Sequence, residues 1–99
     1  RAKSWDTACP LGPWITVGGD FDPDNAEISV RVNGEERGSG STSQMGYSVA
    51  RIVSYVSGIC TLLPGDVILT GTPAGGPLKH GERVEVEVAG IGTLTNLAM

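Results

Sequence analysis

The residues that best combine chemical groups with suggestive spacing lie at positions 63–76, which read LPGDVILTGTPAGG. A Pro-Gly-Asp turn precedes an apolar run at residues 67–70, and this order predicts a buried strand. The run leads into Gly71 and Thr72, so the strand would bring one hydroxyl and several backbone amides to one point. Loops at the ends of buried strands commonly carry binding sites. No Gly-Lys-Ser/Thr follows, which argues against a phosphate-binding loop.

The remaining nucleophilic and imidazole side chains do not form a recognisable site. His80 is the single histidine, so a His-rich zinc site is excluded within this chain, and we expect His80 on the surface. Cys9 and Cys60 are far apart and have neither metal-ligand spacing nor a His and Asp set that would indicate a nucleophile. We expect two free thiols, with one disulfide as the less favoured alternative.

Two acidic patterns resemble metal ligands but have simpler interpretations. Asp20, Asp22 and Asp24 alternate as in part of a calcium loop, yet no downstream Glu completes it, which favours a solvated loop. Glu85 and Glu87 form a Glu-x-Glu pair on a strand whose alternate positions are valine. The valines should take the buried face, so this pair is predicted to be solvent-exposed rather than metal-binding.

Composition limits the class of protein. The chain has 99 residues, 39% of them hydrophobic and 18% charged, which fits one small globular domain. Its net charge of −4 and lack of a basic cluster disfavour partners such as nucleic acid or an anionic membrane. No apolar run approaches the roughly 20 residues of a transmembrane helix, and no signal peptide is recognisable. These features favour a cytoplasmic location.

The strand signals predict a mainly β fold. Residues 26–32 alternate apolar and polar, and Asn33-Gly34 follows as a strong hairpin signal before a short return strand at 35–38. After a turn at His80-Gly81, residues 84–88 alternate again, and Gly90 turns the chain into a last strand at 92–97. With strands at 13–17 and 67–70, the total is about six, mainly antiparallel because most connections are short. The predicted fold class is α+β.

One helix is predicted at residues 43–57. Ser41 and Gln44 have the spacing of a capping box, and Gly58 suits the residue after the helix. Gly46 inside this helix is expected to allow close packing on the sheet. The apolar positions recur at helical spacing: Met45, Val49, Ile52, Val53 and Val56.

Together these residues carry a resemblance to the C-terminal half of the fumarylacetoacetate hydrolase family. The matching blocks are KSWDT and PLGPW at residues 3–14, VNGE at 32–35 with Thr42-Ser43, LPGD through TP at 63–73, and GIGTL at 90–94. Their order spans nearly the whole chain, and the likeness is greatest to the acylpyruvate hydrolase and 2-hydroxyhepta-2,4-diene-1,7-dioate isomerase type. The resemblance implies a rolled mixed β-structure.

The resemblance also implies roles for individual residues. Lys3 matches a catalytic lysine, whose ammonium can stabilise developing negative charge near a metal-bound substrate. Thr7 matches a threonine close to the metal, with Lys3 beside it. Thr72 and Gly71 match a loop that binds the substrate carboxylate. The implied cofactor is Mg²⁺, or Mn²⁺ or Ca²⁺, held by carboxylates that the family places upstream of the lysine block.

Because the chain begins at that block, we expect a single domain, residues 1–99, that is a C-terminal portion of a larger catalytic domain. Alone it should be inactive and bind Mg²⁺ weakly. The whole protein would hydrolyse, decarboxylate or tautomerise small 2-oxo or enol acids in aromatic catabolism, as a homodimer or packed against the preceding segment. The alternative is a non-catalytic β-rich remnant or dimerisation domain of that family.

Overall fold

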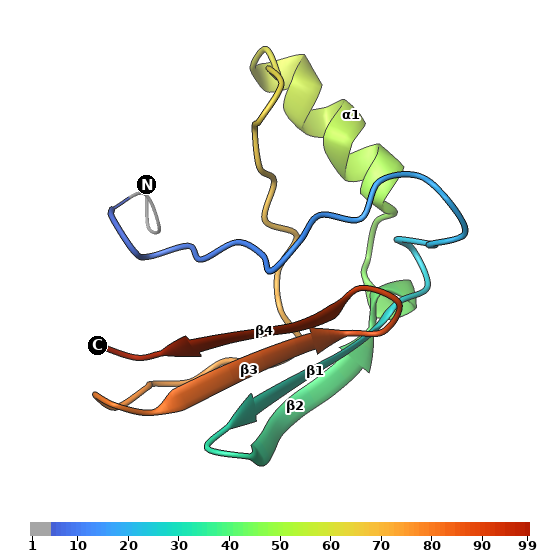
Figure 1. Cartoon of the computed structure of the whole chain (residues 1–99). Coiled ribbons are helices and arrows are strands. Elements are labelled where there is room, and N and C mark those ends of the chain that lie inside the picture. Colours follow the sequence, from blue (N-terminus) through green and yellow to red (C-terminus); the bar gives the residue numbers. More distant parts are fainter. Residues whose placement is uncertain (1–4) are drawn as a thin grey trace.

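A four-stranded antiparallel sheet organises the chain (Figure 1). The computed structural model describes residues 5–99. The strands are β1 (Glu27–Val32), β2 (Glu35–Ser41), β3 (Arg83–Val88) and β4 (Gly92–Leu97), in the spatial order β2-β1-β3-β4. With the single α-helix described below, this confirms the predicted mainly β, α+β class.

The sheet has one apolar and one polar face, as the alternation predicts. In register, Ile28, Val30 and Val32 of β1 lie opposite Val88, Val86 and Val84 of β3. The polar face carries Ser29 and Arg31 opposite Glu87 and Glu85. Val32 and Ala26 are the buried apolar residues of the described chain, each 4% exposed. The core therefore lies along β1.

The β1–β2 hairpin is confirmed at the predicted turn. Asn33 and Gly34 both have positive φ, 51° and 83°, which the tight two-residue turn requires. β2 is longer than the predicted return strand at 35–38, because its pairing with β1 continues until Ser41 lies opposite Glu27. A register shift between Val30 and Arg31 marks a bulge in this pairing.

The helix prediction is wrong at both ends. The capping box of Ser41 and Gln44 exists, but it caps a short 3-10 turn, η1 (Thr42–Gln44), after which the backbone at Met45 is extended. The α-helix, α1, is Val49–Ile59 and begins after Ser48. Gly46 therefore lies outside the helix, with nothing within 4 Å of a Cβ there, and Gly58 lies inside it.

Two side chains fix the start of α1 and explain its position. The Ser48 hydroxyl accepts from the amide of Arg51 at 3.3 Å, and the Asp24 carboxylate accepts from the amide of Val49 at 2.7 Å. Unpaired amides of a first helical turn favour such acceptors, especially charged ones. The prediction of a solvated loop is therefore wrong for Asp24, which caps the helix.

The predicted strands at 13–17 and 67–70 are absent from the described structure. Both segments lack a neighbouring strand with which to pair, and their side chains are exposed: Ile15 83%, Val17 86%, Val67 53% and Leu69 55%. The first segment is held instead by Trp14, whose Nε1 donates to the Ile91 carbonyl at 2.7 Å. β-propensity alone does not create a strand without a partner edge.

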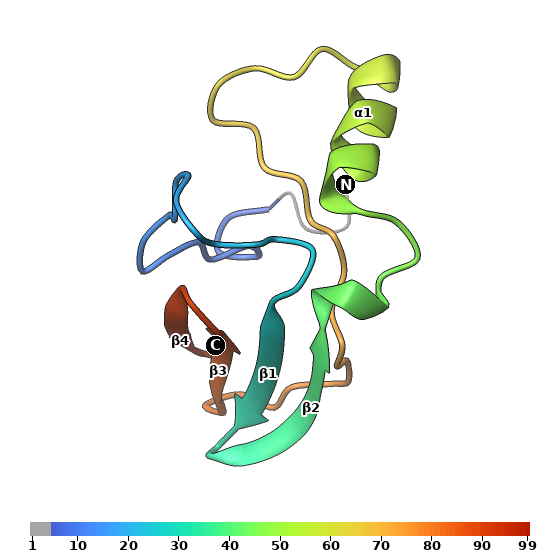
Figure 2. The ribbon, with the colours of Figure 1, turned by 90° about the vertical axis from the view of Figure 1, so that its right-hand side faces the viewer.

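Much of the apolar surface outside the sheet is uncovered. α1 stands clear of the sheet in both views, and the segment after it runs past the N-terminal segment toward β2 (Figures 1 and 2). The accessible surface is 7556 Å², whereas a compact monomer of 10.2 kDa has about 5,300 Å². Exposed large side chains include Tyr55, Ile59 and Leu63.

The contact between Asp24 and α1 generates a stability prediction. Asp24→Ala should lower the free energy of unfolding by about 1–2 kcal/mol, because the first turn loses a charged acceptor. Asp20→Ala, at an exposed position of the same loop, should change it by less than about 0.5 kcal/mol. Urea denaturation followed by circular dichroism measures both. Equal effects of the two variants would show that Asp24 does not cap α1.

Candidate functional site

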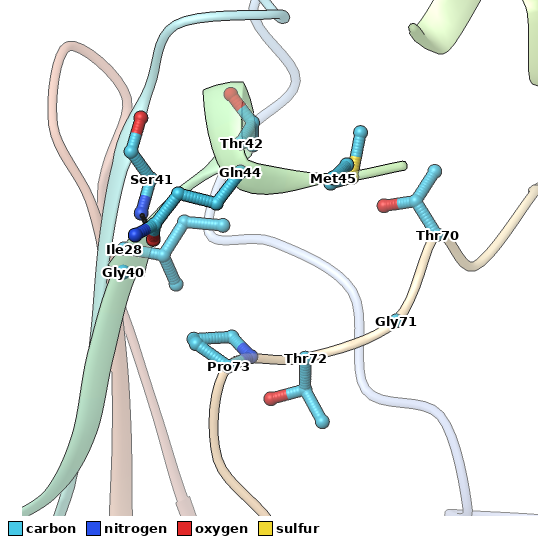
Figure 3. A pocket seen from close by; sticks show the side chains of 10 residues that line it. All are labelled: Ile28, Gly40, Ser41, Thr42, Gln44, Met45, Thr70, Gly71, Thr72 and Pro73. Atoms are coloured by element: carbon cyan, nitrogen blue, oxygen red, sulfur yellow. Dashed lines mark hydrogen bonds between the residues drawn. The ribbon is translucent and has the colours of Figure 1, made fainter. Parts of the chain in front are cut away.

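A pocket lies where the loop after residue 69 meets the end of β2. It has a volume of about 320 Å³. One wall comes from the end of β2 and the turn after it, and the opposite wall from the loop, with Ile28 of β1 between them (Figure 3). The lining residues are Ile28, Gly40, Ser41, Thr42, Gln44, Met45, Thr70, Gly71, Thr72 and Pro73.

The β2 wall is fixed by local hydrogen bonds. The Gln44 side-chain oxygen accepts from the Ser41 amide at 3.0 Å, and the Thr42 hydroxyl accepts from the Ala26 amide at 2.8 Å. The Ser41 hydroxyl accepts from the Ser43 amide at 3.2 Å. These bonds engage the acceptor oxygens of this wall, so a ligand would meet mainly the side chain of Met45 here and that of Ile28 beside it.

The loop wall contains both substrate-binding residues predicted from the sequence. Gly71 has φ of 106°, a conformation that strongly favours glycine. The Thr72 hydroxyl donates to the Ala74 carbonyl at 2.8 Å and accepts from the Ala74 amide at 3.3 Å. In this conformation the hydroxyl closes a local turn, while the amides of Gly71 and Thr72 have no hydrogen-bond partner within residues 5–99.

Thr70 is a pocket residue that the sequence analysis missed. Its hydroxyl points into the space beside Met45, whereas the Thr72 hydroxyl points to the other side of the loop (Figure 3). The sequence pattern alone places Thr70 only at the end of a predicted apolar strand. The signal that could have singled it out is its position as the last residue before Gly71, where a strand opens into a loop.

The other predicted site residues are not in this pocket. Lys3 lies outside the described residues. Thr7 is exposed, does not line the pocket, and has a positive φ of 67° in a turn closed by the Ala8 amide and the Trp5 carbonyl at 3.2 Å. A β-branched residue rarely adopts this conformation, and such strain is often found at functional positions.

The Glu-x-Glu pair of β3 is engaged with arginine. Arg31 contacts Glu87 at 2.9 Å and Glu85 at 3.9 Å, and Arg83 contacts Glu85 at 3.8 Å. The Glu85 side chain is only 18% exposed, so the prediction of a fully exposed pair is wrong for this residue, because two guanidinium groups cover it. The pair is charge-neutralised on the polar face of the sheet.

The described residues do not provide a metal site of their own. No group of three or more His, Cys, Asp or Glu side chains converges within residues 5–99. A hard divalent cation is normally held by several oxygen ligands, chiefly carboxylates. The pocket itself contains hydroxyls and amides but no carboxylate, so its donor set does not fit such an ion. His80 is exposed, as predicted, and Cys9 and Cys60 are free thiols.

The chain has a mainly β fold, with the loop of Gly71 and Thr72 beside its sheet. Nearly all of the chain matches a known protein family. Residues 1–97 match the family described as fumarylacetoacetate (FAA) hydrolase, C-terminal. The chain belongs to the fumarylacetoacetate hydrolase family, as the sequence motifs predicted. Enzymes of this family include both hydrolases and isomerases.

Individual relatives confirm the fold. A solved 5-carboxymethyl-2-hydroxymuconate delta-isomerase from Mycobacterium smegmatis is 52% identical, with a TM-score of 0.89, over 97% of this chain and 38% of that one. Maleylpyruvate hydrolase from Sphingobium, solved with manganese(II) and pyruvate, is 34% identical, with a TM-score of 0.87, over 94% and 36%. A human mitochondrial oxaloacetate tautomerase is 43% identical over 95% of this chain and 33% of its own length. The chain therefore spans well under half of these relatives.

The backbone of the loop generates a second stability prediction. Gly71→Ala should lower the free energy of unfolding by about 1–3 kcal/mol or displace the loop, because a Cβ is strained at this φ. Gly75→Ala in the same loop has an ordinary φ and open space around its Cβ, and should change stability by less than about 0.5 kcal/mol. Urea denaturation and the amide NMR signals of residues 70–74 report the two effects. A Gly71→Ala protein indistinguishable from wild type would contradict the required conformation.

Proposed function

We propose that this chain forms one part of an enzyme that acts on small 2-oxo or enol acids, by C–C bond hydrolysis or by tautomerisation. The observation that carries the proposal is the pocket of about 320 Å³, which is lined by Gly71 and Thr72, whose amides have no hydrogen-bond partner within residues 5–99, and by the apolar side chains of Ile28 and Met45. It is supported by relatives that are named as an isomerase, a hydrolase and a tautomerase. We propose that the reaction, whichever of these two it is, serves the catabolism of aromatic compounds.

The pocket suits an acid with one charged and one apolar end. The amides of Gly71 and Thr72 would donate to the substrate carboxylate, and the Thr70 hydroxyl adds a third donor on the same wall. The Thr72 hydroxyl could join them only by turning away from the Ala74 carbonyl, to which it now donates. Ile28 and Met45 on the opposite side would contact the remainder of the substrate.

Lys3 is proposed as the catalytic group. Its ammonium would stabilise negative charge that develops on the substrate oxygen as the enolate or oxyanion forms. Thr7 is proposed to lie near a divalent cation, and its strained backbone supports a functional role. Such a cation, whether Mg²⁺, Mn²⁺ or Ca²⁺, would polarise the substrate carbonyl, and its carboxylate ligands would have to lie outside residues 5–99.

The alternative is a family member that no longer catalyses the reaction. The internal bonds of the Thr72 hydroxyl and the absence of a metal-ligand group within residues 5–99 are compatible with it. The complete reading frame separates the two proposals, because the enzyme requires a Glu-x-Glu pair and an Asp before Lys3. Within residues 5–99, no helix is long and apolar enough to span a membrane, and the cytoplasmic location stays a prediction.

Kinetics of the complete gene product test the proposed roles. On acetylpyruvate, Lys3→Ala should lower kcat by about 100- to 1000-fold, because the ammonium acts on charge that grows in the transition state. Thr72→Ala should mainly raise KM, because the carboxylate is present throughout the reaction. Lys79→Ala and Thr61→Ala, at exposed positions outside the pocket, are the matched controls. A near-normal kcat for Lys3→Ala on every 2-oxo acid that the wild type turns over would reject the role of Lys3.

We also propose that the uncovered apolar surface packs against a second copy of the chain or another part of the polypeptide. Exposed side chains of α1 and the segment after it, such as Tyr55, Ile59 and Leu69, support this. The isolated 99-residue chain should therefore form dimers or larger species. Light scattering at micromolar concentrations measures this, and a sharp monomer mass would count against self-association.

A further inference from the structure

The loop wall of the pocket rests on two glycines of β2. Gly38 and Gly40 are alternate residues of one strand, so both face the apolar side of the sheet, opposite Val30 and Ile28 of β1. Glycine inside a strand often marks a place where another backbone approaches closely. Here the approaching backbone is the loop at residues 73–74.

The contact at Gly38 is too close for any side chain. A Cβ placed there would lie 2.6 Å from the Cβ of Ala74 and 3.3 Å from both the Ala74 Cα and the Pro73 carbonyl oxygen. At Gly40, a Cβ would lie 3.2 Å from the Cβ of Pro73. The neighbours at Gly38 include backbone atoms, so the loop itself would have to move away from the sheet.

Movement of Ala74 is transmitted to the pocket. The Thr72 hydroxyl bonds both the carbonyl and the amide of Ala74, and therefore ties the pocket wall to the residue that touches Gly38. Gly38 does not line the pocket, whereas Thr72 and Pro73 do. The distance between residues 73–74 and β2 therefore determines how far the loop wall of the pocket lies from the wall formed by the end of β2.

We propose that Gly38 is a positioning residue: its missing side chain seats Ala74 on β2 and so holds the amides of Gly71 and Thr72 at the correct distance from the opposite wall. This inference rests on the proposed function for the identity of the ligand, but the seating of the loop can be measured without it. A glycine at this position is needed for the shape of the site, not only for the strand.

The test adds a methyl group at Gly38 and then removes the methyl group of Ala74 on the other side of the contact. Gly38→Ala should displace the loop, and adding Ala74→Gly should return it most of the way, because the second change removes the 2.6 Å contact and leaves only the two 3.3 Å contacts with backbone atoms. Gly58→Ala, where nothing lies within 4 Å of the new Cβ, is the control. The three variants and Ala74→Gly alone are made in the complete gene product.

Kinetics on acetylpyruvate give the first readout. Gly38→Ala should raise KM about tenfold with kcat within about twofold of wild type, and the double variant should return KM to within about twofold. A merely structural role would not be rescued by a second change that itself adds a flexible glycine to the loop. An unchanged KM in Gly38→Ala, or a double variant as impaired as the single one, would overturn the proposal.

Amide NMR of residues 70–74 gives the second readout and separates the two claims. If the wild type turns over no 2-oxo acid, the proposed function fails, and the NMR signals alone decide the seating of the loop. They should shift in Gly38→Ala, return toward the wild-type positions in the double variant, and stay unchanged in Gly58→Ala. Signals that do not move in Gly38→Ala, or do not return, would overturn the proposal.

Discussion

β1 is hydrogen-bonded along both edges, and the two antiparallel ladders that it shares with β2 and β3 form the centre of the sheet. Its residues Ile28, Val30 and Val32 form the centre of the apolar face, and Val32 is one of the two buried apolar residues described. Two hydrogen bonds join the residues just before β1 to later segments: Ala26 is bonded to Thr42 of η1, and Asp24 to the start of α1. Loss of β1 would therefore release the turn, the helix and the pocket together.

In the pocket, strand β2 supports an irregular loop, residues 70–76, through close contact at its glycines. Residues 70–76 carry small side chains and form no regular structure, yet they lie at a defined height because backbone meets glycine backbone. Close packing of this kind is sensitive to a single added methyl group.

Local patterns predicted the parts of the fold that depend on local physics. The alternation of residues 26–32 and 84–88 and the Asn33-Gly34 turn were sufficient for β1, β3 and the hairpin. The start of α1 was not predictable in this way, because it depends on Asp24, which is 25 residues distant. Residues 13–17 and 67–70 have strand-like sequences but no partner edge in the described chain. Gly71 and Thr72, predicted from the sequence to bind substrate, line the pocket, and that role stays a prediction, whereas Thr70 could be found only from the direction of its hydroxyl in the folded chain.

The large accessible surface of 7556 Å² has a consequence for the shape of the stability curve. The heat capacity change of unfolding and the denaturant m-value both grow with the area newly exposed when a chain unfolds. A chain that already leaves roughly 2,200 Å² more in water than a compact monomer has less to expose. Its free energy of unfolding is therefore expected to vary less with temperature, and its transition in denaturant is expected to be broad. A partner surface that covers the exposed face would increase both the heat capacity change and the m-value.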